Sequence, residues 1–259
     1  MDQGDFVGGI LMDLSKAFDC IDHDLLIAKL DAYGFDKSAL IYIYSYLKGR
    51  RQRVKINNSY SDFLTIIAGV PQGSILGPIL FNIFINDLYF IIEDSNLHGY
   101  ADDHTISNNA KNLHTLKTIL CSDSNKAIDW LNDNKMLANP SKFQAIVLTK
   151  SKETIQTTFK IKDAIITSGN EVDLLGITID DKLKFDTHIK NLCHRAGGQL
   201  NTLNRLEKYF TSFCKKLTIN SYITSNFNYC PLVWHFCSSN SSNMIERIQR
   251  RAFRFIDMG

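Results

Sequence analysis

The sequence predicts an α+β protein in which a mixed portion, residues 1–181, precedes an all-helical portion, residues 182–259. Up to residue 181, apolar runs of strand length alternate with segments of helical periodicity, and only helical patterns follow. The charge changes at the same point. Residues 182–259 contain 12 Lys and Arg against 4 Asp and Glu, a net charge of +8, and residues 1–181 contain 17 against 23, a net charge of −6. The basic portion suits a polyanionic partner, although a solvated helical surface would have the same composition.

The composition of the 259 residues disfavours several classes of protein. At 44% hydrophobic residues the chain can bury a sizeable core, which argues against disorder. The six cysteines are scattered without a CxxC pair, which argues against a zinc site. No secretory signal opens the chain, and no apolar run reaches the roughly 18 residues of a membrane span. We therefore expect an intracellular protein of the nucleus, the cytoplasm or both, with reduced thiols and no membrane partner.

The elements of the mixed portion can be placed from their patterns. A buried strand at residues 6–13 is followed by two helices that glycines end, and then by a hairpin of two β-type runs. A turn with Ser74 as the cap opens an apolar core helix, and a second hairpin and an amphipathic helix follow. Three further β-type segments and three helical segments complete the chain. After the first strand these elements cover residues 22–34, 37–49, 50–70, 75–92, 97–109, 112–134, 142–150, 159–169, 172–183, 187–206, 211–230 and 241–256.

The hairpin that contains "GYADDHTI" holds two adjacent carboxylates, Asp102 and Asp103, at its expected turn. Adjacent carboxylates repel each other, and a divalent cation between them offsets that repulsion. Asp13 closes the first strand and can supply a third carboxylate if that strand lies beside the hairpin. Such a cluster suits two metal ions about 3.5–4 Å apart and in-line phosphoryl transfer. Without Asp13, ordinary turn chemistry is the more common explanation of an Asp-Asp pair.

Five stretches in order resemble the reverse transcriptases of non-long-terminal-repeat retrotransposons. Three are the palm stretches "LMDLSKAFDCIDHDLL", "GVPQGSILGPILFNIFINDL" and "GYADDHTI", and the other two are "NPSKFQAIVL" and "LLGITIDDKLKFDTHI". The resemblance implies the fold of a right-hand polymerase palm, an antiparallel sheet backed by helices, followed by a helical thumb. It implies a polymerase that transfers nucleotides from dNTPs to the 3′-hydroxyl of a DNA primer on an RNA template. The chain begins 12 residues before Asp13, so we expect the family's fingers to be missing.

The resemblance also implies the roles of the site residues. Asp13, Asp102 and Asp103 would be the catalytic, metal-binding carboxylates, with the backbone carbonyl of Leu14 as a further ligand. Asp103 would be the least direct of the three ligands. The cofactor would be two Mg²⁺ ions, with Mn²⁺ as an alternative.

Four further positions match nucleotide-binding residues of the family. Phe18 falls where a bulky ring excludes a ribose 2′-hydroxyl, and Gln72 and Gly73 fall in the turn that meets the incoming nucleotide. Lys142 falls where a lysine gives a proton to the leaving pyrophosphate. Each has a plainer explanation: a core phenylalanine, an ordinary Pro-Gln-Gly-Ser turn, and a surface lysine before a strand.

Other polar residues are expected to have supporting roles. We expect Asp19 to make a local hydrogen bond or a helix cap rather than a metal contact, and Asp22 and Asp24 to begin a helix. Arg50, Arg51 and Arg53 could contact template phosphates. The hairpin with Leu175 and Gly176 would hold the primer end, and Trp234 is expected in the core. In the thumb, the cations expected to meet phosphates are Lys190, Arg195, Arg205 and Lys208.

Three functions stay open at this point. The first is an RNA-directed DNA polymerase fragment, and the second is a catalytically inactive retrotransposon remnant that at most binds nucleic acid. The third is a related polymerase, either a group II intron maturase or a viral RNA polymerase, and Phe18 argues against RNA synthesis. A Ca²⁺-binding module is disfavoured because the sequence has no 12-residue loop of oxygen ligands.

Overall fold

The computed structural model describes residues 5–14, 16–151 and 153–257. The chain divides into two compact units, Met1–Asn170 and Glu171–Gly259. The hairpin of β11 (Glu171–Leu174) and β12 (Ile177–Asp180) therefore groups with the helices that follow it. The sequence pattern instead placed the boundary after residue 181, because it registers where strands stop and not which elements pack together.

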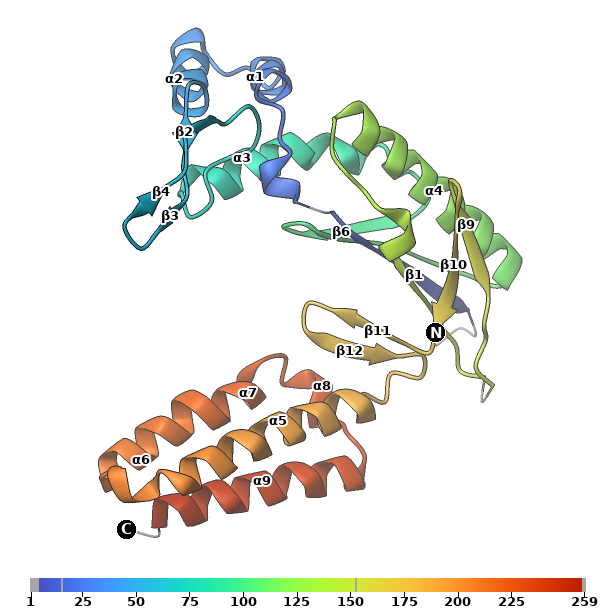
Figure 1. Cartoon of the computed structure of the whole chain (residues 1–259). Coiled ribbons are helices and arrows are strands. Elements are labelled where there is room, and N and C mark those ends of the chain that lie inside the picture. The colour runs from blue at the N-terminus through green and yellow to red at the C-terminus, as the bar shows by residue number, and fades with distance from the viewer. Residues whose placement is uncertain (1–4, 15, 152, 258–259) are drawn as a thin grey trace. The chain divides into compact units, whose positions relative to one another are not determined.

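The first unit is built on a six-stranded sheet with the strand order β6-β7-β1-β8-β10-β9. Figure 1 labels β6, β1, β10 and β9 of this sheet. The pair β8–β10 is parallel and the other neighbouring pairs are antiparallel, so the expected antiparallel sheet is in fact mixed. β1 lies between β7 and β8 and pairs antiparallel with both. The six strands are β1 (Phe6–Asp13), β6 (Asn96–Tyr100), β7 (Asp103–Ala110), β8 (Gln144–Leu148), β9 (Thr158–Ile161) and β10 (Ala164–Gly169).

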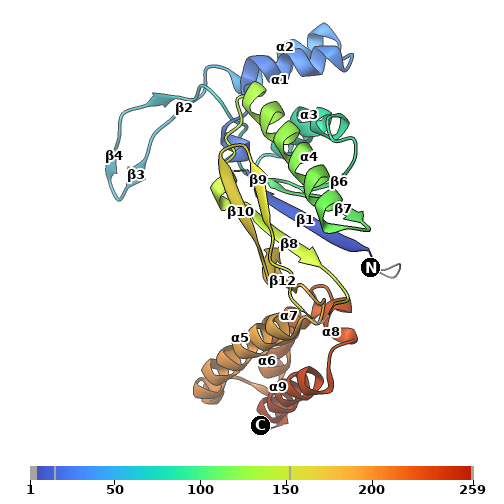
Figure 2. The same cartoon turned by 90° about the vertical axis from the view of Figure 1, so that its right-hand side faces the viewer.

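The helix α4 (Leu113–Asp133) covers one face of this sheet (Figure 2). Asn112 caps it, because its side-chain oxygen accepts a hydrogen bond from the Thr115 N–H at 2.7 Å. Its apolar face is buried, as its periodicity predicted. Gly8 of β1 permits the close approach of the helix: a Cβ there would lie 2.7 Å from the Leu120 Cδ1 atom.

Three further helices of the first unit are α1 (His23–Ala32), α2 (Lys37–Leu47) and α3 (Leu76–Ile85). The Asp22 carboxylate caps α1, and the Ser74 hydroxyl accepts a hydrogen bond from the Gly77 N–H at the start of α3, both as expected. The expected single helix over residues 75–92 is wrong in length. α3 ends at Ile85 and tightens into a 3₁₀ turn, Asn86–Phe90.

A polar contact explains the early end of α3. The Lys29 ammonium group donates to the Phe84 carbonyl at 2.7 Å and to the Asp87 carboxylate at 2.6 Å. It therefore satisfies a carbonyl that the helix end leaves without an internal partner.

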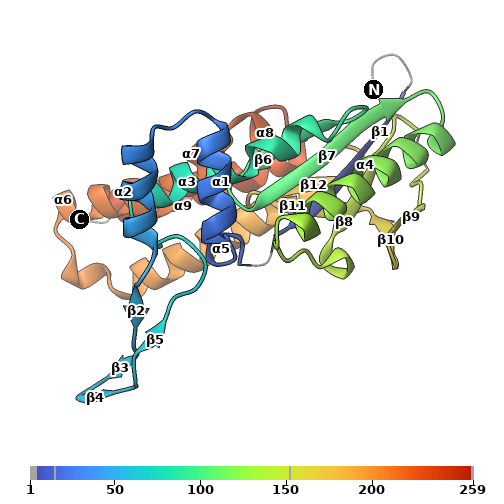
Figure 3. The ribbon, with the colours of Figure 1, turned by 90° about the horizontal axis from the view of Figure 1, so that it is seen from above.

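Between α2 and α3 the chain forms a two-stranded hairpin, as the β-type runs predicted. It contains the short strands β2 (Arg51–Gln52), β3 (Lys55–Ile56), β4 (Ser59–Tyr60) and β5 (Leu64–Thr65), with β2 paired to β5 and β3 to β4. Figures 2 and 3 show this hairpin extending away from the sheet and helices of its unit.

The second unit packs its helices around a core of its own. The helices are α5 (Asp186–Arg205), α6 (Ser212–Thr218), α7 (Ser225–Asn228), α8 (Leu232–His235) and α9 (Ser239–Asp257), with a π-helical turn at Ile219–Thr224. Its buried apolar side chains include Ile189, Leu200, Ile223, Ile248 and Phe255. Within the described parts of the chain, no helix has the length and apolar character needed to cross a membrane.

Candidate active site

Asp13 and Asp103 lie directly opposite each other on the antiparallel strands β1 and β7. Directly opposed residues of an antiparallel pair project from the same face of the sheet, so the two carboxylates share a face. Side chains alternate along a strand, and Gly8 faces α4, so Asp13 lies on the face that α4 does not cover. Both aspartates are exposed. The sequence prediction that the first strand brings its terminal carboxylate to the hairpin is thus supported by the strand register.

Asp102 lies in the two-residue turn between β6 and β7, next to the end of β1. Tyr100 pairs with Asp103, which leaves Ala101 and Asp102 as the turn residues. Ala101 has φ +54°, a left-handed conformation that matches the twist of a tight hairpin. The Leu14 N–H donates to the Asp102 carbonyl at 3.4 Å, which holds the turn beside the strand end. The backbones of Asp13, Leu14, Asp102 and Asp103 are therefore neighbours at this end of the sheet.

Electrostatics at this strand end favour a cation. Partial burial and the neighbouring charges of Asp102 and Asp13 raise the pKa of the Asp103 carboxyl. His104, the next residue, is buried, and burial lowers the pKa of its imidazole. The charges that raise the pKa of Asp103 are uncompensated carboxylates, which a divalent ion would neutralise.

The carboxylate and backbone oxygens at this strand end suit a metal ion that completes its coordination with substrate and water. Among the described residues, no group of three or more His, Cys, Asp or Glu side chains lies close enough to hold a metal ion by itself. Mg²⁺ commonly uses one or two carboxylates and completes its shell with water and substrate phosphates. Asp13 and Asp103 on one face, with backbone oxygens of the turn nearby, meet that lesser requirement.

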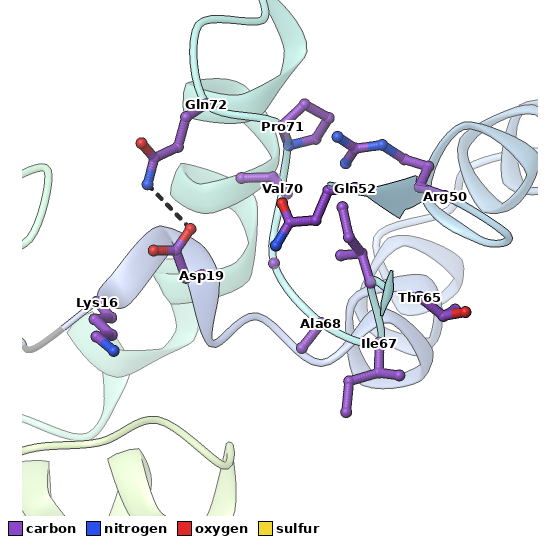
Figure 4. Close-up of a pocket in the computed structure, with 12 residues that line it drawn as sticks. Lys16, Asp19, Arg50, Gln52, Thr65, Ile67, Ala68, Val70, Pro71 and Gln72 are labelled. Atoms are coloured by element: carbon purple, nitrogen blue, oxygen red, sulfur yellow. Dashed lines mark hydrogen bonds between the residues drawn. The ribbon is translucent and has the colours of Figure 1, made fainter. Parts of the chain in front are cut away.

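A cavity of about 700 Å³ has a lining that includes Lys16, three residues after Asp13, together with Asp19, Arg50, Gln52, Thr65 and Gln72 (Figure 4). The Gln72 side-chain amide donates to the Asp19 carboxylate at 3.0 Å. Asp19 was expected to make a local hydrogen bond, and this is wrong, because its partner is 53 residues away in the sequence. Gly73, the next residue, has φ +78°, and a Cβ there would meet no atom within 4 Å. The glycine therefore serves the backbone conformation and leaves open space beside the cavity.

Phe18 lies in the 3₁₀ turn Ala17–Asp19, five residues after Asp13. Its half-buried ring stacks on the buried ring of Phe81 in α3, with centroids 4.4 Å apart and an interplanar angle of 28°. The Phe18 carbonyl accepts a hydrogen bond from the Val70 N–H at 2.9 Å. The ring is thus fixed in place by the core while part of it stays accessible.

Gly69 and His23 hold the segment before Gln72 against the segment that carries Phe18, and sequence reasoning missed both. Gly69 has φ +85°, and a Cβ there would lie 2.8 Å from the Cα and carbonyl oxygen of Asp19. The buried His23 ring contacts the Gly69 carbonyl through its Nε2 atom at 2.8 Å. The sequence signal for Gly69 was a glycine directly before the Val-Pro-Gln-Gly stretch. A glycine alone does not indicate that its position makes a close backbone contact.

Lys142 lies at the same end of the sheet as Asp13. In the antiparallel pair β1–β8, Leu11 lies opposite Gln144. Asp13 comes two residues after Leu11 and Lys142 two residues before Gln144, so both lie at the same end of this pair. Lys142 ends a 3₁₀ turn, Pro140–Lys142, and is exposed. The structure therefore places this lysine at the end of the sheet that carries Asp13.

Residues 5–179 match the family model described as "Reverse transcriptase (RNA-dependent DNA polymerase)". The chain belongs to the reverse transcriptase family. Its α+β palm followed by helices agrees with the fold that the sequence predicted, and members of this family use divalent metal ions.

Known reverse transcriptases of mobile elements are similar along nearly the whole chain. The "Probable RNA-directed DNA polymerase from transposon BS" of Drosophila melanogaster is 29% identical over 272 residues, covering 98% of this chain and 29% of that protein. The RNA-directed DNA polymerase from mobile element jockey of the same species is 26% identical over 266 residues, covering 99% and 29%. The chain thus spans just under a third of the length of these relatives.

Two other similarities are more limited. A protein of COX1/OXI3 intron 2 from Saccharomyces cerevisiae is 39% identical over 85 residues, which is 33% of this chain and 9% of that protein. The solved structure of telomerase from Candida tropicalis with a TWJ fragment of telomeric RNA superposes with a TM-score of 0.48 at 16% identity, over 68% of this chain and 29% of that chain.

The helical unit of this reverse transcriptase lies almost wholly beyond residue 179, where the family match ends. Leu175 and Gly176 form the turn of the β11–β12 hairpin, with φ values of +50° and +80°. The Tyr229 hydroxyl donates to the Leu175 carbonyl at 2.7 Å and so fixes this turn to the helices. Trp234 packs against the helical core, as expected, and its indole N–H donates to the Phe227 carbonyl at 2.9 Å. The four thumb cations named from the sequence, Lys190, Arg195, Arg205 and Lys208, are all exposed.

Proposed function

We propose that this chain carries the catalytic part of an RNA-directed DNA polymerase of a non-long-terminal-repeat retrotransposon. It would transfer nucleotides from dNTPs to the 3′-hydroxyl of a DNA primer on an RNA template. The observation that supports this most directly is the register that sets Asp13 opposite Asp103, beside the turn that holds Asp102. The similarity to BS and jockey polymerases along nearly the whole chain supports the retrotransposon origin.

The three aspartates and the Leu14 carbonyl would hold the divalent metal, as two Mg²⁺ ions or with Mn²⁺ in their place. When bound, these ions lower the pKa of the attacking hydroxyl and stabilise charge on the leaving pyrophosphate. Asp13 and Asp103 contribute adjacent oxygens from two paired strands, and Asp102 contributes from the turn. The sheet fixes the backbones of Asp13 and Asp103, and the turn fixes that of Asp102, so folding brings the three backbones to one place before any nucleotide binds.

The cavity beside Gln72 would take the incoming dNTP, since its volume of about 700 Å³ lies within the range of small-molecule sites. Gln72 is oriented by Asp19, and Gly73 leaves its surroundings open for the close approach of a nucleotide. Phe18, fixed on Phe81, would oppose a ribose 2′-hydroxyl and so favour deoxynucleotides.

Lys142 would give a proton to the leaving pyrophosphate. It is exposed at the sheet end that also carries Asp13, so a phosphate group held through a metal ion on the aspartates would lie near this end of the sheet.

An inactive remnant remains the alternative function, and it predicts nucleic-acid binding without synthesis. The preserved site geometry disfavours it, because the carboxylates share one face of the sheet and the Gln72–Asp19 contact is made. An intron-encoded polymerase is disfavoured as well, since that similarity covers only a third of the chain.

Primer extension on an RNA template with Mg²⁺ tests the proposal. We expect the chain to incorporate dNTPs, and Asp102→Asn and Asp13→Asn each to abolish incorporation while leaving the fold intact by circular dichroism. Asp133→Asn is the matched control, because Asp133 is an exposed aspartate at the end of α4, the helix that covers the face of the sheet opposite to Asp13. RNA binding by the unmodified chain without any incorporation would instead identify the inactive remnant.

A further inference from the structure

The hairpin between α2 and α3 carries five exposed side chains in which cations and aromatic rings alternate. The Arg51 guanidinium lies 5.3 Å from the ring centroid of Phe63, and the Arg53 guanidinium lies 4.6 Å from Phe63 and 4.1 Å from Tyr60. The Lys55 ammonium lies 5.3 Å from Tyr60. All these distances are within the range of cation–π attraction. The order Arg51, Phe63, Arg53, Tyr60, Lys55 is here called the cation–aromatic ladder.

The alternation of side chains between the two faces of each strand explains the ladder. Arg51, Arg53 and Lys55 are two residues apart, so they project from one face of the hairpin. Lys55 pairs directly with Tyr60 across the hairpin, which puts that ring on the same face. The opposite face carries Val54 and Ile56, which are also exposed.

No described residue of the first unit buries the ladder's rings completely. Tyr60 and Phe63 are 50% and 52% exposed, and Figures 2 and 3 show the hairpin extending away from the sheet and helices of its unit. The segment 50–67 contains four basic residues and one acidic residue, Asp62. Among the described residues, none of these four cations forms an ion pair with a carboxylate, so their charge is available to a polyanion.

The root of the hairpin leads to the candidate active site. Arg50, Gln52 and Thr65 line the same cavity as Asp19 and Gln72 (Figure 4). Thr65 pairs with Arg51 and so shares the ladder's face, whereas Arg50 and Gln52 lie on the other face. A chain bound along the ladder would therefore reach, on its Thr65 side, the cavity that the proposed function assigns to the nucleotide.

We propose that the cation–aromatic ladder binds single-stranded nucleic acid and guides it to this cavity. Phosphates would meet the Arg and Lys side chains, and unpaired bases would stack on the Tyr60 and Phe63 rings and on guanidinium planes. Bases within a duplex are already stacked on one another, so the exposed rings favour a single strand. The cation–π contacts also restrict the arginine side chains before binding, which lowers the entropy cost of ordering them. Only the identification of this strand as the RNA template rests on the proposed function.

The test is binding of a labelled, unstructured 20-nucleotide RNA and of a blunt duplex of equal length, without dNTP. All variants are made in the Asp102→Asn background, so the outcome does not depend on catalysis. We expect the double variant Tyr60→Ala/Phe63→Ala to weaken single-strand binding about tenfold or more and to change duplex binding less than about twofold. Val54→Ala/Ile56→Ala, on the opposite face, should leave both affinities unchanged.

Two further comparisons separate charge from stacking. Lys55→Ala should lower the slope of log affinity against log salt by about 0.7, whereas Lys37→Ala, the loss of an equally exposed lysine on α2, should not. Arg53→Lys keeps the charge and loses the planar group, so it should weaken binding at unchanged salt slope. Arg53→Lys also tests the contribution of stacking if Tyr60→Ala/Phe63→Ala fails to fold.

Three results would overturn the proposal. They are unchanged single-strand binding in the ring variants, an equal loss for single strand and duplex, and a change of oligomeric state in Val54→Ala/Ile56→Ala together with lost binding. The last result would show that the hairpin is an interface between copies of this chain.

Discussion

The side-chain amide of Gln72 donates a hydrogen bond to the Asp19 carboxylate at 3.0 Å, and so joins the turn before α3 to the turn after β1. This contact assigns Asp19 a positioning role. It would orient a residue of the cavity proposed for the nucleotide, while metal binding is proposed for Asp13, Asp102 and Asp103.

Substitution of Asp19 distinguishes positioning from metal binding. We expect Asp19→Ala to raise the KM for dNTP about three- to tenfold with kcat nearly unchanged, because one hydrogen bond is lost from the binding site. Asp19→Asn keeps an acceptor oxygen and should behave like the unmodified chain in steady-state primer extension. If Asp19→Asn were as inactive as Asp13→Asn, Asp19 would have to be counted among the metal ligands.

Gly69 and Gly73 provide a matched pair of left-handed glycines. At Gly69 an alanine would add the left-handed strain and also collide with the Asp19 backbone, so we expect Gly69→Ala to lower the free energy of unfolding by about 2–4 kcal/mol. At Gly73 the space is open, and Gly73→Ala should cost only about 1 kcal/mol. Urea denaturation measures both. Equal losses would mean that the Asp19 segment moves aside freely.

Phe18 combines a core contact with the proposed selection against ribonucleotides. Phe18→Ala should raise the ratio of ribonucleotide to deoxynucleotide kcat/KM by about tenfold or more. It should also reduce stability, because the stacking on Phe81 is lost. Phe81→Leu is the control, since it weakens the same stack and leaves the Phe18 ring present. A Phe18→Ala chain that is less stable and equally selective would show that Phe18 is a core residue alone.

The raised pKa of Asp103 predicts a pH-dependent cost to folding in the absence of metal. A carboxyl whose pKa is higher in the folded state than its ordinary value of 3.8 destabilises the fold while it is charged. That cost disappears as the pH falls through the raised pKa. In EDTA at pH 7, Asp103→Asn should therefore unfold at a higher urea concentration than the unmodified chain, and the difference should vanish near pH 3.

Mg²⁺ should reverse the order of stability at pH 7, so that the unmodified chain becomes more stable than Asp103→Asn. Mg²⁺ at one hundred times its Kd stabilises a binding-competent fold by about 2.7 kcal/mol, and Asp103→Asn should gain less. A variant that is already less stable than the unmodified chain in EDTA would contradict the repulsion between the aspartates.

The sequence predicted those features that depend on local pattern. The hairpin around Asp102 and the amphipathic face of α4 follow from turn chemistry and periodicity, and the structure agrees, although the turn residues are Ala101 and Asp102 and Asp103 already belongs to β7. The register of Asp13 with Asp103 matches a hypothesis that depended on the first strand lying beside the hairpin. Features decided by contacts between distant segments were not predictable. Gly69 is required by the backbone of Asp19, and the partner of Asp19 is Gln72, so neither could be inferred from its own neighbours.

The length of α3 illustrates the same limit. Its apolar pattern continues to Ile92, yet the helix ends at Ile85 because Lys29 of α1 takes the Phe84 carbonyl and pairs with Asp87. Periodicity contains no information about that lysine.

The Lys29–Asp87 pair should contribute measurably to stability. The Lys29 side chain is largely buried, lies over the Phe84 and Trp130 rings at 4.5 Å each, and has its pKa lowered by burial despite Asp87. Asp87→Ala removes the acceptor of Lys29 and of the Trp130 indole N–H, and we expect a loss of about 1–3 kcal/mol in urea denaturation. Because the folded state disfavours the lysine charge, the loss should shrink as the pH rises toward 10.5. Asp133→Ala serves as the control. If it lowers the free energy of unfolding as much as Asp87→Ala does, the Lys29–Asp87 pair makes no specific contribution to stability.

β1 pairs with an antiparallel strand on each side, and this has a consequence for how a copy of a retrotransposon loses activity through mutation. Asp13 faces Asp103 only because five earlier residues of β1 are matched with β8 on the other side. Deleting one codon within β1 would turn Asp13 to the face covered by α4 or force both neighbouring strands to re-pair. In-frame deletions here should therefore silence a copy more completely than most single substitutions, even when every catalytic codon survives.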